Sequence, residues 1–317
     1  MTTPNDSTQA SPTSNPSGVY RDGHAARPER ARRRALVALL VLAGCSPSEP
    51  ARAPEPPAPP PPEKSAWPEP PAPESESVVH AEFATSAQAV KPKGKFLLAV
   101  RFQIEPGYRI SWQNPGDVGK STQVAFEVPP GFSVGPLLYP APQRFELPGK
   151  LVNYGYENET AIFAEVTAPE RVADGKAFRF DVKATWLACK DECATEELSA
   201  WFELVSAAHA PEPALPAELS QFLDAVPPAF GDLPKSNLDW RADSAHPALT
   251  LKAAKVKWLD FIPGNEEQPK LIRMKPTGEQ LELTFASDGS SPLRGLAVAE
   301  VEGKRSFFDL NVPWPER

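Results

Sequence analysis

The sequence predicts an all-β protein, in which a β-sandwich is followed by a second, smaller β-sandwich-like domain. Three observations favour this fold class. Apolar and polar residues alternate with a period of two over several short runs, and clusters of Gly, Pro, Asn and Asp separate these runs. The chain also lacks a P-loop, a glycine-rich dinucleotide fingerprint and a sustained alternation of strands and helices.

Residues 1–44 are expected to form a lipoprotein signal peptide. A cluster of arginines from Arg30 to Arg34 precedes nine apolar residues, Ala35 to Ala43, a run that is too short to span a bilayer as a helix. The run ends at Leu42-Ala43-Gly44-Cys45, which resembles the lipobox in which the cysteine becomes acylated and N-terminal. We therefore expect a lipid on Cys45. The alternative is an ordinary signal peptide with an incidental cysteine.

Residues 45–75 are expected to be a lipid-anchored, proline-rich linker. Thirteen of the 28 residues from 46 to 73 are Pro, so this segment cannot bury enough apolar surface to fold. Polyproline II rises about 3.1 Å per residue, which would hold a domain on the order of 90 Å from the membrane. Ser46 follows Cys45 in place of the Asp that retains many lipoproteins at the inner membrane, so the outer membrane is favoured. No later run approaches 18 apolar residues, and no membrane-crossing helix is expected.

The first β domain is expected over residues 76–206. Between Phe178 and Ala188 every even-numbered residue is apolar, and the odd-numbered residues from Arg179 to Thr185 are polar, as in a half-buried antiparallel strand. The segment Asn114-Pro115-Gly116-Asp117 has the composition of a turn. The expected strands are 79–84, 96–104, 108–112, 124–128, 161–166, 178–188 and 198–204.

A linker over residues 207–235 and a second β domain over residues 236–317 are expected to follow. The linker is polar and rich in proline, and its residues 216–225 place Leu219, Phe222 and Leu223 on one face of a short helix. The strands expected in the second domain are 248–251, 256–262, 281–285, 293–301 and 306–312.

The charge balance argues against nucleic acid as a partner. The formal net charge is -8 at pH 7, and the dense arginine cluster lies in the expected signal peptide. A surface that binds phosphates needs clustered Lys and Arg.

Cys189 and Cys193 are the candidate reactive residues, because they are the two cysteines left once Cys45 is acylated. A disulfide needs Cα atoms about 4.4–6.8 Å apart, whereas four residues of extended strand span about 13 Å. The chain must therefore turn between the two cysteines, and the three intervening residues are polar, as a turn requires. We expect the pair at the rim of the sandwich, within reach of another protein.

Three chemical roles are open for this pair. A purely structural disulfide would stabilise little, because closing so small a loop contributes only about 2 kcal/mol. Two thiolates can hold Cu(I), whereas zinc needs four ligands, and the histidines show no ligand spacing. Reversible thiol–disulfide exchange is the favoured role, and it needs no cofactor. No Gly-x-Ser-x-Gly motif for hydrolysis is present.

The charges beside the cysteines refine this role. Asp191 and Glu192 outweigh Lys190, and neighbouring carboxylates disfavour a thiolate. We therefore expect the disulfide form to be attacked by the thiolate of a partner, so that the protein acts as a relay.

Four ordered blocks resemble one family. They are Gly107–Asp117, Tyr139–Gly149, Asn153–Glu157 and Ala184–Cys193. Together they resemble the periplasmic N-terminal domain of DsbD-type protein-disulfide reductases, in particular the branch that includes ScsB. The likeness of residues 236–317 to the second β region of that branch is much looser.

The resemblance implies an immunoglobulin-like sandwich whose two cysteines cycle between dithiol and disulfide. It implies electrons taken from a thioredoxin-like domain or a membrane-embedded DsbD-type reductase and passed to periplasmic thiol proteins, in cytochrome c biogenesis or copper tolerance. By position, Cys189 and Cys193 would have this role. The chain departs from the family in having no membrane spans and no thioredoxin domain. It also has Arg109 where the family often has His, and Ala194-Thr195 where the family often has Ile-Pro-Gly.

Several aromatic residues in these blocks are candidates to pack over the cysteines and shield them from oxidation. They are Trp112, Phe145, Tyr154, Tyr156 and Trp186. Core packing or anchoring of loops is the alternative role for each. A second hypothesis for the whole chain is a scaffold or a Cu(I)-handling module that does not exchange thiols.

Overall fold

The computed structural model describes residues 77–241, 246–265, 268–287, 289 and 291–315. Almost all regular structure in this part of the chain is strand, which confirms the all-β, immunoglobulin-like fold class. The expected signal peptide, Cys45 and the proline-rich linker lie outside the described residues, and the expected domain boundaries stay a prediction.

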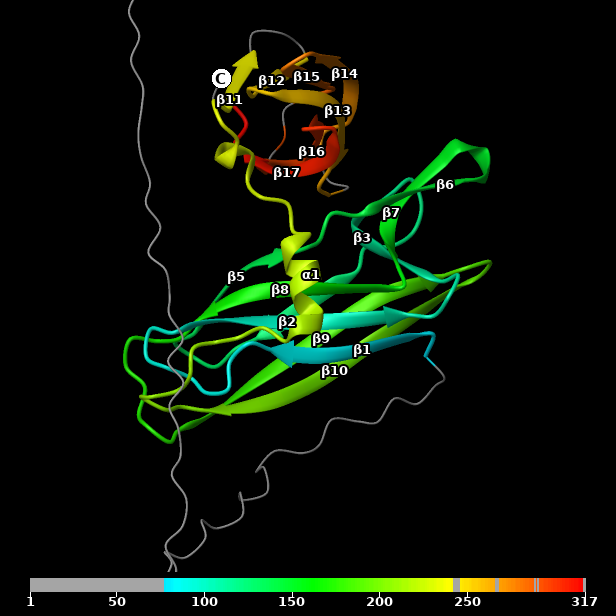
Figure 1. Cartoon of the computed structure of the whole chain (residues 1–317). Coiled ribbons are helices and arrows are strands. Elements are labelled where there is room, and N and C mark those ends of the chain that lie inside the picture. The colour runs from blue at the N-terminus through cyan, green and yellow to red at the C-terminus, as the bar shows by residue number, and fades with distance from the viewer. Residues whose placement is uncertain (1–76, 242–245, 266–267, 288, 290, 316–317) are drawn as a thin grey trace, which may run out of the picture. The chain divides into compact units, whose positions relative to one another are not determined.

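Residues 79–205 form two antiparallel sheets, in the orders β1-β2-β8-β5 and β10-β9-β3-β7-β6, with β4 also paired to β9 (Figure 1). The strands are β1 Val79–Thr85, β2 Lys95–Ile104, β3 Arg109–Gly116, β4 Gln123–Glu127, β5 Ser133–Leu138, β6 Gln143–Leu147, β7 Leu151–Glu157, β8 Glu159–Thr167, β9 Ala177–Cys189 and β10 Cys193–Val205.

The alternation seen in the sequence determines which face of β9 is buried. Its even-numbered residues from Phe178 to Ala188 are buried, whereas none of its odd-numbered residues is. Burying such side chains contributes about 1.5–3 kcal/mol each. β10 pairs with β9 along the full 13 residues of both strands, from Cys189 opposite Cys193 to Ala177 opposite Val205. The cysteines therefore lie at one end of a long hairpin.

The prediction of a turn at residues 114–117 is wrong about where the turn begins. Strand β3 continues to Gly116, and the turn begins at Asp117. Asn114 is buried, and its side-chain oxygen accepts a hydrogen bond from the backbone N–H of Gly116 at 3.0 Å. Gly116 has a φ of 86°, and a Cβ there would lie 2.6 Å from the carbonyl oxygen of Val152, so only glycine fits.

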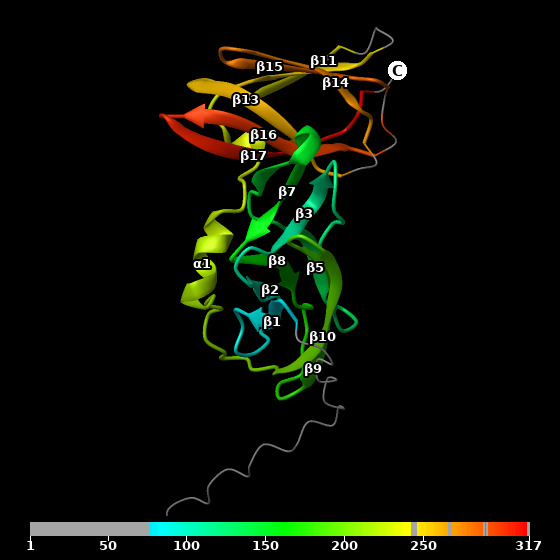
Figure 2. The same cartoon turned by 90° about the vertical axis from the view of Figure 1, so that its right-hand side faces the viewer.

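The helix expected over residues 216–225 is present as α1, Ala217–Asp224. Its buried Leu219 packs with Ala99, Ala161 and Phe163, which belong to β2 and β8. The helix thus covers one face of a sheet, as Figure 2 also shows.

Residues 237–312 form two further antiparallel sheets around their own apolar cluster, in the orders β11-β12-β15-β14 and β13-β16-β17 (Figure 2). The five strands expected in this region are present, together with two that were not expected, β11 and β14. The bounds are β11 Asn237–Arg241, β12 Ala248–Lys252, β13 Val256–Pro263, β14 Leu271–Thr277, β15 Gln280–Phe285, β16 Leu293–Val301 and β17 Lys304–Val312.

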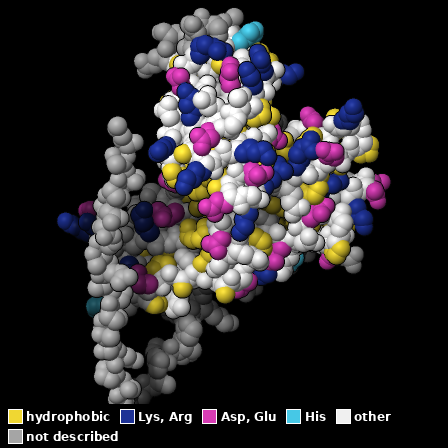
Figure 3. Space-filling model, turned by 45° about the horizontal axis from the view of Figure 1, so that its top comes forward, with side chains coloured by type: hydrophobic (Ala, Val, Ile, Leu, Met, Phe, Trp, Pro, Cys, Tyr) yellow, Lys and Arg dark blue, Asp and Glu magenta, His cyan; other side chains and the backbone are white. Residues whose placement is uncertain are grey.

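On the face of the molecule drawn in Figure 3, basic and acidic side chains are interspersed. Several of the charged side chains form exposed ion pairs, such as Lys183 with Glu127 and Lys95 with Glu165. Within the described ranges, no helix is long and apolar enough to cross a membrane.

Candidate functional site: a disulfide at the end of a hairpin

Cys189 and Cys193 form a disulfide at the end of the β9–β10 hairpin. Cys189 is the last residue of β9 and Cys193 the first of β10, and their Cα atoms are 4.1 Å apart. Lys190, Asp191 and Glu192 make the turn, in which the backbone N–H of Lys190 donates to the carbonyl oxygen of Glu192 at 3.0 Å. The three polar residues between the cysteines thus turn the chain, as their composition predicts.

The two cysteines differ in their access to solvent. Cys193 is exposed, whereas Cys189 is half-buried. Both are odd-numbered residues of strands whose even-numbered residues face the core, so the bridge lies on the outer face of its sheet. A thiol group of another molecule therefore reaches the sulfur of Cys193 more readily.

Arg109 is a neighbour of Cys189 that the sequence did not identify as part of the site. It is the first residue of β3 and lies directly opposite Cys189 on β9. Its guanidinium lies 5.3 Å from the ring centroid of Phe145 on β6, so the aromatic face holds the cation. Strand pairing thus places the backbone of Arg109 opposite Cys189, although 80 residues separate them in the chain (189 − 109), while its charged group reaches towards β6, away from β9.

Lys190, the first residue of the turn between the cysteines, packs against the loop that precedes β3. Its ammonium nitrogen lies 5.5 Å from the ring centroid of Tyr108. Gly107 precedes that tyrosine with a φ of 85°, and a Cβ there would lie 3.1 Å from Cε of Lys190. A glycine with positive φ therefore lets the lysine lie against the loop that enters β3.

The charges close to the disulfide are those of the turn. Asp191 and Glu192 are exposed to solvent there, whereas Lys190 lies over the ring of Tyr108 and Arg109 over that of Phe145. Water screens the exposed carboxylates, so the surroundings of the disulfide are mildly acidic, as the local sequence indicates.

The aromatic shielding candidates lie in different environments. Trp112, Tyr156 and Trp186 are buried in the sandwich core. Tyr154 is half-buried and packs against that core. Phe145 is half-buried on β6, which β7 and β3 separate from β9, and it holds the guanidinium of Arg109, so shielding of the cysteines stays a prediction.

Glu196 links the disulfide hairpin to Ser77 and Val78, the first of the described residues. Its carboxylate accepts hydrogen bonds from the indole N–H of Trp186 at 3.0 Å, the hydroxyl of Ser77 at 2.7 Å and the backbone N–H of Val78 at 2.9 Å. Trp186 and Glu196 are each three positions from a cysteine, on opposite strands of the hairpin. Ser77 and Val78 are therefore held on the core-facing side of the hairpin, three residues or about 10 Å of extended strand from the cysteines.

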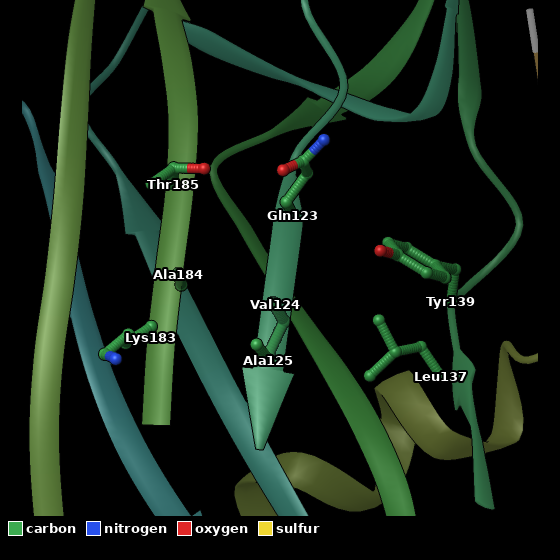
Figure 4. A pocket seen from close by; sticks show the side chains of 8 residues that line it. All are labelled: Gln123, Val124, Ala125, Leu137, Tyr139, Lys183, Ala184 and Thr185. Carbon is green, nitrogen blue, oxygen red and sulfur yellow. The ribbon is translucent and has the colours of Figure 1, made fainter. Parts of the chain in front are cut away.

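A groove lies between β4 and the end of β5 and is lined mainly by apolar groups, including Val124, Leu137, Tyr139 and Ala184 (Figure 4). Thr185 also lines it and lies four residues before Cys189, which is about 13 Å along an extended strand. The groove is therefore separate from the disulfide chemistry.

Burial of Tyr139 gives a testable pH dependence. Desolvation raises the pKa of its phenol from 10.0 to about 12, and its hydroxyl donates to the carbonyl oxygen of Thr122 at 3.2 Å. The folded state then binds more protons than the unfolded state between these pH values, so the free energy of unfolding falls as pH rises from 10 towards 12. Urea unfolding on both sides of pH 10 should show a smaller fall for Tyr139→Phe than for the wild type. Equal falls would contradict this assignment.

Among the described residues, no group of three or more His, Cys, Asp and Glu side chains is arranged to hold a metal ion.

Residues 75–200 match the family model described as thiol:disulfide interchange protein DsbD, N-terminal. Among solved structures, the N-terminal periplasmic domain of ScsB from Proteus mirabilis is 18% identical with a TM-score of 0.47, and the match covers 74% of this chain and 94% of that chain. A protein of unknown function from Porphyromonas gingivalis W83 is 8% identical with a TM-score of 0.22, covering 73% of this chain and 99% of that chain. A comparison with curated proteins gives no match.

Proposed function

Because residues 75–200 belong to the N-terminal domain family of the thiol:disulfide interchange protein DsbD, we propose that this chain is a thiol–disulfide relay. In this role it accepts electrons from a reduced partner and passes them to a thiol protein through Cys189 and Cys193. The observation that carries the proposal is an exposed sulfur in a disulfide at the end of a hairpin that is paired along its whole length.

The hairpin supports reversible chemistry because its fold does not depend on the bridge. The two cysteines are already opposite each other in a ladder that runs for 13 residues, and the even-numbered side chains of β9 anchor that ladder in the core. Closing a loop of this size removes little entropy from the unfolded chain, so the bond contributes only about 2 kcal/mol. Its reduction should leave the sandwich folded.

In the proposed exchange, a thiolate of the reduced partner attacks the sulfur of Cys193. A bond forms between the partner sulfur and Cys193, the Cys189–Cys193 bond breaks, and Cys189 leaves as a thiolate and takes a proton from water. A second thiol of the partner then attacks the partner's own sulfur in the mixed disulfide and releases Cys193. Two electrons have moved to the cysteine pair, and the partner holds a disulfide. The reverse sequence would reduce the next protein.

The location and partners follow as parts of the same proposal. We place the domain in the periplasm, attached through a lipid on Cys45, with the outer membrane favoured. Its electron donor would be a thioredoxin-like domain or a membrane-embedded DsbD-type reductase, and its acceptors would be envelope thiol proteins. The family of residues 75–200 and the lipobox-like sequence that ends at Cys45 support this placement.

Reduction of the folded protein tests the relay. We expect dithiothreitol to open the bond under native conditions, after which both cysteines react with a maleimide while the circular dichroism spectrum stays native. Equilibration with glutathione should then give a reduction potential within the range of exchanging pairs and above that of structural disulfides, about -300 mV. A bond that opens only on unfolding would support a structural role, and stoichiometric uptake of Cu(I) without exchange would support the copper-handling alternative.

A further inference from the structure

The strand that carries Cys193 is the border strand of its sheet. Among the described strands, β10 has β9 as its single neighbour (Figure 1). Such a border leaves every second residue with an N–H and a C=O group that have no partner strand. The unpaired edge begins at Cys193, the more exposed of the two cysteines.

The spacing of the cysteines shows which residues have their backbone groups directed outward. Directly opposed residues of an antiparallel pair are about 4.5 Å apart when they do not hydrogen-bond to each other and about 5.5 Å apart when they do. The Cα atoms of Cys189 and Cys193 are 4.1 Å apart, so these two residues direct their backbone groups away from each other. On β9 those groups face Arg109 of β3, which agrees with the pairing of Cys189 and Arg109.

The odd-numbered residues of β10 therefore direct their N–H and C=O groups towards the open edge. The far end of the strand agrees with this, because the carbonyl oxygen of Val205 accepts a hydrogen bond from the backbone N–H of Val90 at 3.1 Å. That contact also shows that this edge accepts backbone hydrogen bonds from another segment. At the cysteine end, no described residue pairs with the outward backbone groups of Cys193, Thr195 and Glu197.

We propose that β10 is the docking edge of the relay, on which an extended, cysteine-bearing segment of the partner adds as a further strand beside Cys193. The inference rests on the proposed function and specifies how the partner is recognised. Backbone pairing along Cys193 and Thr195 would bring the partner sulfur next to the exposed sulfur of Cys193. The segment then supplies the thiolate that forms the new bond to Cys193, while Cys189 leaves as described above.

The charges near the edge indicate the chemistry of the segment. Asp191, Glu192 and Glu197 are exposed around the cysteine end of β10. Opposite charges across neighbouring strands are favourable and like charges are not. A segment with Lys or Arg next to its cysteine fits this edge.

The N-terminal linker of the chain is a poorer occupant of the same edge. Residues 65–76 contain four prolines, which have no N–H to donate, and three glutamates, Glu69, Glu74 and Glu76. Their carboxylates would face the exposed carboxylates of β10. The observations therefore favour a basic partner segment.

Synthetic thiol peptides test the docking edge on the full chain. The probes are a short extended peptide with a central cysteine flanked by lysines, the same peptide with glutamates, and the lysine peptide with alternate backbone nitrogens methylated. We expect the lysine peptide to open the disulfide about tenfold faster than either of the others, because each of them loses charge pairing or backbone hydrogen bonds. Dithiothreitol, which needs no strand pairing, is the reference thiol.

A proline substitution in β10 provides the reciprocal test, because it changes the protein instead of the peptide. Thr195→Pro removes an outward N–H and leaves the ladder with β9 intact, since prolines are accepted on border strands. Thr195→Pro should lower the rate at which the lysine peptide opens the disulfide about tenfold and leave the rate with dithiothreitol unchanged. Thr195→Ala, which keeps the N–H, should lower the rate with the lysine peptide by less. The methylated peptide gives the same information on the unmodified protein if Thr195→Pro does not fold.

The outcomes separate this inference from the relay itself. Equal rates for the lysine peptide and its methylated form would overturn docking on β10 and leave the relay in place. Equal rates for the lysine and glutamate peptides would overturn the basic character of the partner segment. A disulfide that no thiol opens in the folded protein would overturn the relay, and the docking edge with it.

Discussion

Cys189→Ser should convert the protein into a trap for its partners. The remaining Cys193 is exposed, and its thiolate can attack the disulfide of an oxidised partner, but this chain then has no second thiol opposite it to resolve the mixed disulfide. Net exchange should fall to the uncatalysed background, and with an oxidised thioredoxin-like protein a covalent adduct should accumulate. Non-reducing electrophoresis and mass spectrometry of the intact adduct measure both effects.

Cys193→Ser is the matched control for this trap. It leaves the half-buried Cys189, whose sulfur a second protein reaches less easily. Adduct formation should therefore be at least about tenfold slower than with Cys189→Ser, since attack on a disulfide depends on access to the thiolate. Equal trapping by the two variants would show that exposure does not select the attacking sulfur. A double Cys→Ser variant that still turns over would remove the relay altogether.

Trp186→Ala should cause the largest loss of stability of any substitution near the site. Trp186 is 2% exposed, and its ring meets that of Phe102 edge to face with centroids 5.1 Å apart. Truncation of such a residue leaves a cavity and costs about 3–5 kcal/mol in the free energy of unfolding. It also removes the indole N–H that donates to Glu196. Urea unfolding with the disulfide kept oxidised measures the loss.

Trp201→Ala provides the comparison on the outer face of the same hairpin. Trp201 is half-buried on β10, and the guanidinium of Arg179 lies 5.0 Å from its ring centroid. This substitution should cost about 1 kcal/mol, the range of a partly exposed cation–π contact. If Trp201→Ala destabilised the protein as much as Trp186→Ala does, the assignment of the two faces of the hairpin would be wrong.

The strands that the sequence predicts contain runs of apolar residues, which either alternate with polar residues, as in β9, or are buried on both faces, as in β8 and β16. In β9 the alternation is unbroken, and both the strand and its face are predicted by it. β5 and β14 escape prediction because each contains a proline, Pro136 and Pro276, in what looks like a break. Both are border strands of their sheets, where a missing N–H need not disrupt a ladder. The identity of a border strand depends on the order of strands in the sheet, which a local pattern does not contain.

The sequence likewise predicts the local part of the candidate site and misses the part that depends on strand pairing. The polar residues between Cys189 and Cys193 predict the turn, because the constraint is local. The position of Arg109 opposite Cys189 depends on β3 lying next to β9, a pairing between distant segments. The guanidinium of Arg109 lies over Phe145 on β6, so the charges close to the cysteines are still those that the local sequence shows. The expected turn at Asn114 failed for a related reason, since the pairing of Gly116 with Asn153 on β7 extends the strand.

The hydrogen bonds of Glu196 to Ser77 and Val78 bear on how far the sulfurs can travel. In a domain attached through a linker, the reactive group can lie close to the attachment point or on the far side of the domain. In the second case the width of the domain adds to the reach of the reactive group. Glu196 is three residues from Cys193, about 10 Å along an extended strand, so the proposed linker would enter near the cysteine end of the hairpin and its length would largely determine the reach of the sulfurs. Shortening the proposed linker would then reduce that reach by about 3.1 Å for each residue removed.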